Sequence, residues 1–438
     1  MTIDRRAILA GGLAAGAAMT LPGAAPAATG GSFHKGFLWG ASTAAHQIEG
    51  NNTASDLWLL EHVKPTVFAE PSGDACNSFA LWPTDMDLVK SLGLTAYRFS
   101  LEWARIEPEP GEFSMAMLDH YKAMIDGARQ RGLHPVVTFN HFTAPRWFAA
   151  QGGWTSDAAP GLFARYCARA AKHLAAGIGH AVTLNEPQLL HILKWGGLPP
   201  QVWAIQKATL DAAARQLGVP KFSSANVADL ADLPAMDRNL LAGHRAAREA
   251  IKTVRADLPV GVSIAVEDDQ AIGSAPQRDR KRAEAYAPWL EVARKDDFIG
   301  VQNYTRARFD ANGPVAPPAA APRSDLGQEF YPPSLGNAVR YVHAEARVPV
   351  LVTEHGVGSA DDRLRQQLIP QALAGLKAAM DDGVPVLGYL HWSLLDNYEW
   401  IFGYKPKFGL FAVDRTTFKR TPKPSATLLG AIARRNAL

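Results

Sequence analysis

Two glutamates directly follow runs of apolar residues that predict β-strands. Glu186 lies in the stretch LNEPQ at residues 184–188, and Glu354 lies in TEHGV at residues 353–357. A pair of carboxyl groups that flanks one bond is what glycoside hydrolysis needs: one group protonates the leaving oxygen, and the other attacks the anomeric carbon or activates water. The two roles require different pKa values, so the two side chains need different surroundings. Because much of the chain separates them, the fold must bring them together.

Further polar side chains stand where predicted strands end, although the strand bodies are almost wholly apolar. These residues are Arg98, His141, Asn185, Gln302, Asn303, Tyr304, His355, His391 and Trp392. Packing alone is a poor explanation for polar groups that recur at the same end of successive strands. Asn185, beside Glu186, can hold a sugar hydroxyl, and Tyr304 can hydrogen-bond an ionised carboxylate and keep it deprotonated.

Eight apolar runs alternate with segments of helical periodicity. Predicted strands cover residues 37–43, 96–106, 134–142, 181–187, 259–267, 297–305, 348–356 and 384–395. Predicted helices cover residues 84–94, 114–133, 160–178, 239–258, 279–295, 334–347, 362–383 and 425–436. Strands without polar alternation favour a parallel sheet that is buried on both faces. Eight such units predict an α/β fold of the (β/α)8 TIM-barrel type.

The barrel is expected to form a single domain over residues 28–438, because no change in composition marks a boundary. Residues 188–238 combine GGLPP with mixed polar segments, and their pattern predicts neither helices nor strands clearly. Catalytic groups of such barrels come from the carboxyl ends of the strands. Glu186 follows the fourth predicted strand and Glu354 the seventh, so the two carboxyl groups can face each other across the mouth.

Seven motifs, in order along the chain, resemble those of glycoside hydrolase family 1, the β-glucosidase group. They are FLWGASTAAHQIEG (37–50), YRFSLEWARIEPEPGEF (97–113), VTFNHFTAPRW (137–147), TLNEP (183–187), DFIGVQNYTR (297–306), VTEHGVG (352–358) and HWSLLDNYEWIFGYKPKFGL (391–410). The resemblance covers about residues 33–425. It implies a hydrolase that releases terminal β-glucosyl residues with retention of configuration, for which the two carboxyl groups lie roughly 5–5.5 Å apart.

The resemblance also implies roles for the matching residues. Glu186 matches the general acid/base, and Glu354 matches the nucleophile that forms a covalent glycosyl-enzyme. Arg98, Tyr304 and His355 stand where the charge and orientation of the nucleophile are set. The residues that match the substrate-binding set are Gln47, His141, Asn185, Tyr304, Trp392, Glu399, Trp400 and Phe408.

Within that set, different residues are expected to meet different parts of the sugar. Gln47, His141 and Asn185 match residues that hold hydroxyls of the non-reducing sugar. Glu399 matches the carboxylate at the far hydroxyls, with Trp400 beside it. Trp392 is the expected platform under the sugar ring, because an apolar sugar face stacks on aromatic carbon. Phe408 is the expected aromatic wall of the pocket.

Several departures from the family pattern leave parts of the function open. His355 replaces the usual Asn after the nucleophile, and a charge on it would shift the pKa of Glu354. Gln302 replaces a common Asn, and Phe142 replaces a frequent Trp. Residues 188–238 lie where the family builds part of the aglycone entrance, so the leaving group is not predicted. The sequence does not decide whether the preferred sugar is glucose, galactose or fucose, because Glu399 can bind an axial or an equatorial 4-hydroxyl.

Three other activities compete with glucoside hydrolysis. A transglycosidase that passes the sugar to an alcohol would keep both glutamates. A non-catalytic sugar-binding barrel would be expected to lose one of them, and both are present. A strict 6-phospho-sugar hydrolase usually lacks the NYEW acid and aromatic, which this chain keeps at residues 397–400, although Lys405 and Lys407 lie nearby.

The first 27 residues predict a signal peptide. Arg5 and Arg6 precede an apolar run of small residues and an Ala-Pro-Ala site at 25–27. The run is too short and too rich in Ala and Gly for a stable membrane span. The arginine pair favours the twin-arginine route over an ordinary secretory signal. The mature chain is therefore expected in the periplasm or outside the cell.

Composition argues against other partners and against cofactors. A net charge of +3 is too small to indicate a nucleic-acid or membrane-surface partner. No H-E-x-x-H or C-x-x-C spacing supports a metal, and no G-x-G-x-x-G or Walker motif supports a nucleotide. The two cysteines, Cys76 and Cys167, are expected to be free thiols. The run Arg278 to Arg282 is expected to be a solvated helix start.

Overall fold

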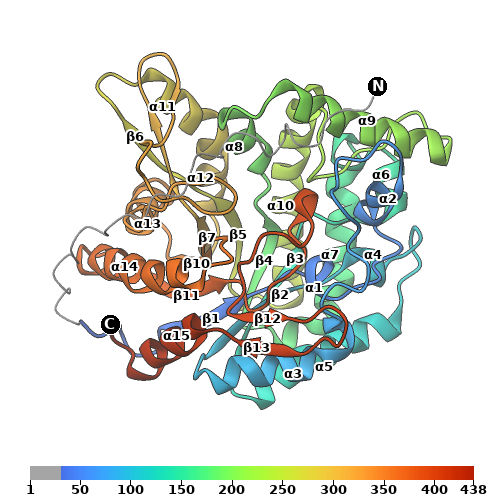
Figure 1. Cartoon of the computed structure of the whole chain (residues 1–438). Helices are drawn as coiled ribbons and strands as arrows, with labels where there is room; N and C mark the ends of the chain where they lie inside the picture. The colour runs from blue at the N-terminus through green and yellow to red at the C-terminus, as the bar shows by residue number, and fades with distance from the viewer. Residues whose placement is uncertain (1–30) are drawn as a thin grey trace.

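The computed structural model describes residues 31–438, and its centre is a closed barrel of eight parallel strands (Figure 1). In chain order the strands are β1 (Leu38–Ser42), β2 (Ala96–Ser100), β3 (His134–Asn140), β4 (His180–Asn185), β5 (Val260–Ala265), β7 (Phe298–Asn303), β10 (Val350–His355) and β11 (Val386–Trp392). Consecutive barrel strands pair with one another, and β1 closes the barrel against β11 with Ala41 opposite His391. The predicted (β/α)8 fold is confirmed.

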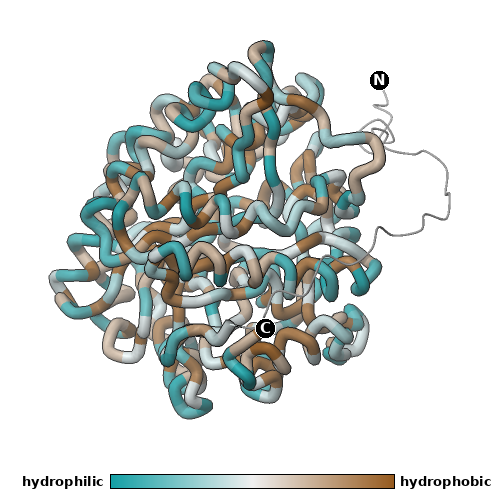
Figure 2. Tube along the Cα trace, turned by 90° about the vertical axis from the view of Figure 1, so that its left-hand side faces the viewer, coloured by the Kyte–Doolittle hydropathy of each residue, from teal (hydrophilic) through white to brown (hydrophobic). Residues whose placement is uncertain are grey.

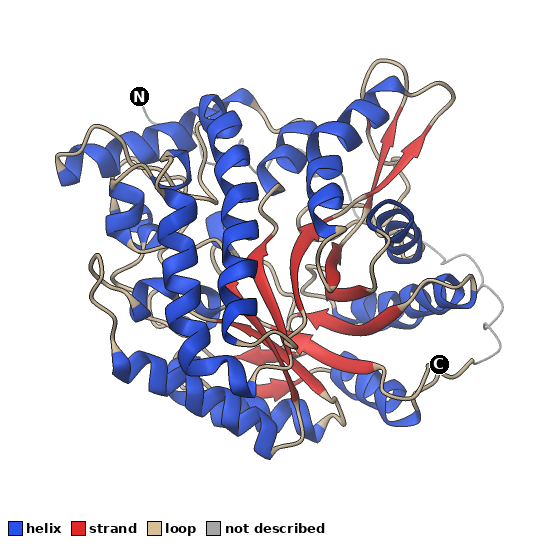
Figure 3. Ribbon diagram, turned by 180° about the vertical axis from the view of Figure 1, so that it is seen from behind, coloured by secondary structure: helices blue, strands red, loops and turns tan. Residues whose placement is uncertain are grey.

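Helices surround the barrel on its outside, as the view from behind shows (Figure 3). They are α3 (Ser78–Ser91), α5 (Met115–Gln130), α7 (Ala159–Leu174), α10 (Leu233–Val254), α12 (Ala287–Ala293), α13 (Ser334–Ala346), α14 (Asp362–Asp381) and α15 (Pro424–Arg435). All of the predicted helices are present. Several begin at a side chain that caps the first turn: Ser114 accepts from the N–H of Met117 at 3.3 Å, and Asp361 accepts from the N–H of Arg363 at 3.0 Å.

Apolar side chains fill both the inside of the barrel and the layer between strands and helices. The inner plug consists of Ala96, Val136, Val182, Phe298, Leu351 and Leu390, all fully buried. Because both faces of each strand are covered, the strands are mostly apolar, as is typical of a parallel sheet. The hydropathy colouring agrees, with teal segments frequent along the outer helices and turns (Figure 2). This packing holds the polar strand ends in fixed positions at one end of the barrel.

Two predicted strands end earlier than the apolar runs that suggested them. β2 ends at Ser100 because the Glu102 side chain accepts from the N–H of Ala104 and starts the short helix α4 (Trp103–Ile106). β11 ends at Trp392, not at Leu395. An apolar run shows burial, but it does not by itself separate a strand from a buried turn.

The segment that the sequence left unassigned is mainly helical. It contains α8 (Leu189–Trp195), α9 (Pro200–Leu217) and the start of α10. Gly218 ends α9 with a φ of 67°, a left-handed conformation that glycine adopts without steric cost. These helices lie beside the barrel at the end where the chain leaves β4 (Figure 1).

A small sheet extends beyond the barrel from the ends of β5 and β7. It consists of β6 (Asp268–Ala271), β8 (Arg306–Phe309) and β9 (Pro314–Val315), and two of its strands project past the barrel in Figure 3. Helix α11 (Pro276–Lys281) follows β6 and runs into a π-helical turn, Arg282–Tyr286, before α12.

The expectation that Arg278 to Arg282 forms a solvated helix start is wrong for Lys281. Its side chain is fully buried, and its ammonium nitrogen lies 2.5 Å from Glu267 Oε2 and 2.5 Å from Asp269 Oδ1. A buried ammonium needs such partners, because burial without them costs several kcal/mol. Lys281 thus fastens α11 to the strand that leads into the small sheet.

The sequence also raised expectations about the two cysteines and the signal peptide. Cys76 and Cys167 are buried and unbridged, as expected. The predicted signal peptide, residues 1–27, lies outside the described residues. Among the helices of residues 31–438, none combines the length and the apolar character that a membrane crossing demands.

Candidate active site

Arg98, at the inner face of β2, is the centre of a buried polar network at the mouth of the barrel. Its guanidinium donates to Glu354 Oε1 at 2.5 Å, to the hydroxyl of Thr138 at 3.0 Å and to the side-chain oxygen of Asn185. The side chain has no exposed surface. The Arg98 guanidinium therefore connects β2, β3, β4 and β10, and it contacts the carboxyl group of the candidate nucleophile.

Glu354 receives hydrogen bonds from three side chains. Besides Arg98, Gln302 donates to Oε1 at 2.9 Å and Tyr304 donates to Oε2 at 2.6 Å. A register shift between Val352 and Glu354 brings Glu354 opposite Gln302 of β7. Burial raises the pKa of Glu354 above its ordinary value, and Arg98 and Tyr304 oppose this shift because they stabilise the carboxylate. The three donors fix the orientation of this carboxyl group and favour its ionised form.

Glu186 lies in a different environment. Its side chain is buried, with 8% of the residue exposed, and within residues 31–438 no group donates a hydrogen bond to its carboxyl oxygens. Burial, together with the charge of Glu354, raises the pKa of Glu186 well above its ordinary value, and Arg98 only partly opposes this. Glu186 is therefore the member of the pair that keeps a proton, as different roles for two neighbouring carboxyl groups require.

The backbone at Glu186 turns sharply. Its φ is 44°, in the left-handed region that glutamate rarely adopts. Its N–H donates to the carbonyl of Ser263 at 2.8 Å, and its carbonyl accepts from the N–H of Leu189 at 2.9 Å. Gln188 then donates to the carbonyl of Ala265 at 2.7 Å. The end of β5 and the first turn of α8 thus hold Glu186 in this conformation.

His141 presents a free donor at the end of β3. The Asn185 amide oxygen accepts from Arg98 and Gln302, so its NH2 group faces His141 Nε2 at 3.2 Å. Nε2 is then the acceptor, and the ring proton is on Nδ1. Burial and the charge of Arg98 hold the pKa of His141 well below its usual value, so the ring is neutral. Nδ1 has no partner within residues 31–438, which suits a ligand that can accept a hydrogen bond.

Gln47 and Glu399 present free acceptors at the same mouth. Gln47 donates to the carbonyl of Tyr398 at 2.6 Å and to Asn397 at 3.2 Å, which leaves its side-chain oxygen unpaired within residues 31–438. Glu399 Oε2 is likewise buried without a partner in that range. Burial and the charge of Glu354 raise the pKa of Glu399 to about 8. Buried polar atoms without partners are rare, and a polyol would satisfy them.

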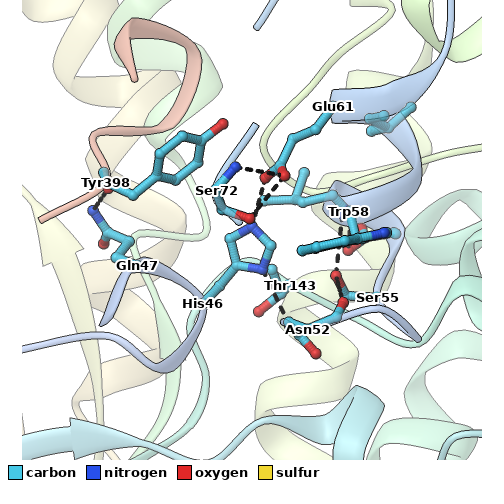
Figure 4. Close-up of polar contacts among 12 residues, drawn as sticks. His46, Gln47, Asn52, Ser55, Trp58, Glu61, Ser72, Thr143 and Tyr398 are labelled. Carbon is cyan, nitrogen blue, oxygen red and sulfur yellow. Dashed lines mark hydrogen bonds and ion pairs between the residues drawn. The ribbon is translucent and has the colours of Figure 1, made fainter. Parts of the chain in front are cut away.

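His46, the neighbour of Gln47 in the chain, is held by a buried network of its own (Figure 4). His46 Nε2 lies 2.8 Å from Glu61 Oε1, and Glu61 Oε2 accepts from the N–H and the hydroxyl of Ser72. The His46 ring is parallel to that of Trp400, at 6.1 Å between centroids. These contacts tie the segment after β1 to the loop that carries Glu399.

Aromatic rings line the rest of the predicted sugar site. His141 is stacked with Trp392 at 5.8 Å and with Trp400 at 5.9 Å, and Tyr304 meets Phe408 edge-on at 5.9 Å. Trp392 and Phe408 pack in one buried cluster. The structure therefore brings the whole predicted substrate-binding set to the mouth that holds Glu186 and Glu354.

His355 points away from the carboxyl group of its neighbour. Its Nδ1 lies 2.9 Å from the hydroxyl of Tyr389, which in turn lies 3.1 Å from His391 Nδ1. Burial lowers the pKa of His355 to about 3, so the ring is neutral above that pH. The expected effect of a His355 charge on Glu354 has no support in this geometry.

Two functional contacts were missed by sequence reasoning. Gln302, expected at a strand end but given no role, bridges Glu354 and Asn185. Thr138, in the middle of an apolar strand, accepts from Arg98 Nε. A polar residue inside an otherwise apolar strand was the available signal for Thr138. Among the side chains of residues 31–438, no group of three or more His, Cys, Asp and Glu is placed to hold a metal ion.

Comparisons with known proteins agree with this geometry. A family model described as Glycosyl hydrolase family 1 matches residues 29–292 and 290–438. The chain is 30% identical to the Beta-glucosidase of Agrobacterium sp., over 91% of this chain and 94% of that protein. The crystal structure of a beta-glycosidase has 44% identity and a TM-score of 0.88, covering 93% of this chain and 98% of that one. An apo structure of a beta-glucosidase has 43% identity and the same TM-score, with coverages of 91% and 98%.

Proposed function

The chain belongs to glycosyl hydrolase family 1, and from this premise we propose that it is a retaining β-glucosidase that removes terminal non-reducing β-D-glucosyl residues. The observation that carries the proposal is the contrast between the two buried glutamates. Glu354 receives three hydrogen bonds that favour its ionised form, and Glu186 receives none within residues 31–438. Double displacement needs such a pair, with one ionised carboxylate as the nucleophile and one protonated carboxyl group as the acid.

In the first step, a carboxylate oxygen of Glu354 attacks the anomeric carbon while the bond to the leaving oxygen breaks. Glu186 gives its proton to that oxygen. Once Glu354 is esterified, its negative charge is lost, and the pKa of Glu186 falls because the like charge no longer opposes ionisation. In the second step, Glu186 takes a proton from water, the water oxygen attacks the same carbon, and Glu354 is released. Configuration is retained because the carbon is inverted twice.

The sugar is held by groups whose hydrogen-bonding atoms have no partner among residues 31–438. His141 Nδ1 donates, while Gln47 Oε1 and Glu399 Oε2 accept. Trp392 supplies the apolar surface on which one face of the ring stacks. Loss of a group that hydrogen-bonds a sugar hydroxyl should weaken the transition state more than it weakens ground-state binding.

The test is release of nitrophenol from a panel of aryl β-D-glucosides, galactosides and fucosides, with the wild type beside Glu354→Gln. We expect strong glucoside turnover that is lost in the variant. Glu329→Gln is the matched control, because Glu329 is also a buried glutamate paired with an arginine, Arg306, outside the site. Full activity of Glu354→Gln, or no turnover of any glycoside by the wild type, would refute the proposal.

Hydrolysis and transfer to an alcohol use the same two glutamates, so products must distinguish them. In the proposed hydrolase, added alcohol acceptor changes the product mixture only in part, and free glucose stays the main product. Glucose that is mostly converted to an alkyl glucoside at low acceptor concentration would assign the protein to the transglycosidases.

We infer from Arg5, Arg6 and the small-residue run behind them that the enzyme is exported and works in the periplasm or outside the cell. Replacement of both arginines by lysine should keep the tagged chain in the cytoplasm if the twin-arginine route is used. Unchanged export would indicate an ordinary secretory signal, and a cytoplasmic wild type would refute export itself.

A further inference from the structure

His191, on helix α8, lies between two carboxylates that come from two other elements. Its Nε2 is 2.9 Å from both oxygens of Asp237 on α10. Its Nδ1 is 3.0 Å from Glu284 Oε1, in the π-helical turn before α12. The histidine is buried, whereas the two carboxylates are partly exposed. One imidazole thus joins three segments that are distant in the sequence.

This geometry favours two ring protons. A neutral imidazole has one N–H and one nitrogen lone pair, so one carboxylate would face that lone pair at about 3 Å. With both nitrogens protonated, each carboxylate accepts a charge-assisted hydrogen bond. Burial lowers the pKa of His191, but Asp237 and Glu284 outweigh it, and the net shift is upward. The other charged group at the cluster is Lys194 of α8, which donates to Glu284 Oε1 at 2.6 Å.

Glu284 collects three donors from α8. Besides His191 and Lys194, the indole N–H of Trp195 donates to Glu284 Oε2 at 3.0 Å. These hydrogen bonds lower the pKa of Glu284 against the opposing effect of burial, so its carboxylate is charged. The residue sits in the π-helical turn, an irregularity that is frequent at functional sites.

Helix α8 is the segment that holds the acid/base in place. It begins three residues after Glu186, whose carbonyl accepts from the N–H of Leu189 at 2.9 Å. The left-handed φ of Glu186 persists only because its surroundings enforce it, since such conformations cost of order 1–3 kcal/mol. Gln188 anchors the start of α8 on β5, and His191 with Glu284 anchors its first turn.

The position of α8 around the barrel assigns it to the leaving-group side. The residues with unused sugar-binding atoms, Gln47, His141 and Glu399, follow β1, β3 and β11. Helix α8 follows β4 and leans on β5, which lies across the barrel from β1 in the strand order. Helix α8 therefore continues directly from the turn that carries the carboxyl group which protonates the leaving oxygen.

We propose that His191, held as an imidazolium between Asp237 and Glu284, is a positioning residue that fixes α8 and thereby aims the Glu186 proton at the leaving group. The proposal rests on the proposed glycosidase function. His191 does not touch the substrate; it acts through the turn at Glu186. Its loss should impair proton donation while the groups that grip the non-reducing sugar stay intact.

Two substrates separate this role from a merely structural one. The leaving group of 2,4-dinitrophenyl β-D-glucoside departs without protonation, whereas that of phenyl β-D-glucoside needs an acid. His191→Phe should lower kcat/KM for the phenyl glucoside at least tenfold more than for the dinitrophenyl glucoside. Glu284→Gln, which leaves the His191–Asp237 contact in place, should show the same selective loss in smaller measure. Equal losses on both substrates, or none, would overturn the proposal.

A matched control and a direct measurement complete the test. His173 on α7 pairs with Asp119 at 2.7 Å outside the site, so His173→Phe should leave the ratio of the two substrates unchanged. In 15N-histidine NMR spectra of the wild type, the His191 signals, identified by their absence from His191→Phe, should show both nitrogens protonated at pH 7. A neutral His191 at that pH contradicts the proposal. If the wild type is inactive on both glucosides, the proposed function is contradicted instead. The NMR measurement needs no enzyme activity, so it still tests the charge of His191 in that case.

Discussion

The hydroxyl of Tyr304 donates to Glu354 Oε2 at 2.6 Å within a buried site, so Tyr304→Phe tests how the nucleophile stays ionised. The hydrogen bond stabilises the charged form of Glu354, and its removal must raise the pKa of that carboxyl group. A hydrogen bond to a charged group contributes about 1.5–3 kcal/mol. Since about 1.4 kcal/mol corresponds to one pKa unit, the pKa of Glu354 should rise by roughly 1–2 units.

The assay is the pH dependence of kcat/KM for p-nitrophenyl β-D-glucoside, which reports ionisations of the free enzyme. The acid limb reports Glu354 and should move to higher pH by about 1–2 units in the variant. The alkaline limb reports Glu186 and should move less. Tyr166→Phe is the matched control, because it also deletes a buried hydroxyl, one that donates to the carbonyl of Phe139 outside the site.

One result would refute this reasoning. If the acid limb of Tyr304→Phe stays at its wild-type pH while the plateau falls, the hydroxyl contributes to orientation or packing and not to the charge of Glu354. Arg98 and Gln302 would then be sufficient to keep the nucleophile ionised.

Three further predictions follow from buried polar groups. His355→Asn should leave the acid limb of kcat/KM in place, because burial keeps His355 uncharged above about pH 3; a shift of that limb would show that His355 acts on the nucleophile. Lys281→Met should lower the midpoint of urea unfolding by the equivalent of about 3–5 kcal/mol, because it leaves the buried carboxylate of Asp269 and the partly exposed carboxylate of Glu267 without the ammonium group; an unchanged midpoint would refute that role. The folded-state pKa of Asp56 is raised to about 7, mainly by burial, so its contribution to the free energy of unfolding falls as pH rises from about 4 to 7. Asp56→Asn should remove that part of the pH dependence, measured by urea unfolding at pH 5 and 7, and an unaltered slope would contradict it.

Much of the site was predictable because its residues stand at strand ends. An apolar run followed by a polar residue marks the point where a barrel strand reaches the mouth, and this placed Glu186, Glu354 and His141 correctly. The motif order then supplied the residues on long connections, such as Glu399. These features depend on local sequence, so they can be identified from the sequence of one chain.

The remaining features depend on three-dimensional register and burial. The shift between β7 and β10 that brings Gln302 to Glu354 has no sequence signal. Lys281 was expected in solvent because its neighbours in the chain are basic, but it contacts the carboxylates of Asp269 on β6 and of Glu267 just before β6. His355 was expected to act on Glu354, yet its side chain turns to Tyr389. Each difference reflects a partner that is distant in the sequence.

Within the described part of the chain, Glu186, Glu354 and Glu399 share the mouth with one guanidinium, that of Arg98, and this imbalance of charge affects the thermodynamics of binding. With a pKa of about 8, Glu399 holds its proton in the empty protein at neutral pH. A bound sugar whose hydroxyls donate to Glu399 favours the carboxylate instead, so the proton leaves with ligand entry. Binding of the sugar is then coupled to the buffer. The observed heat of association will depend on the ionisation enthalpy of whichever buffer accepts the proton, and affinity will increase with pH until Glu399 is ionised before the ligand arrives.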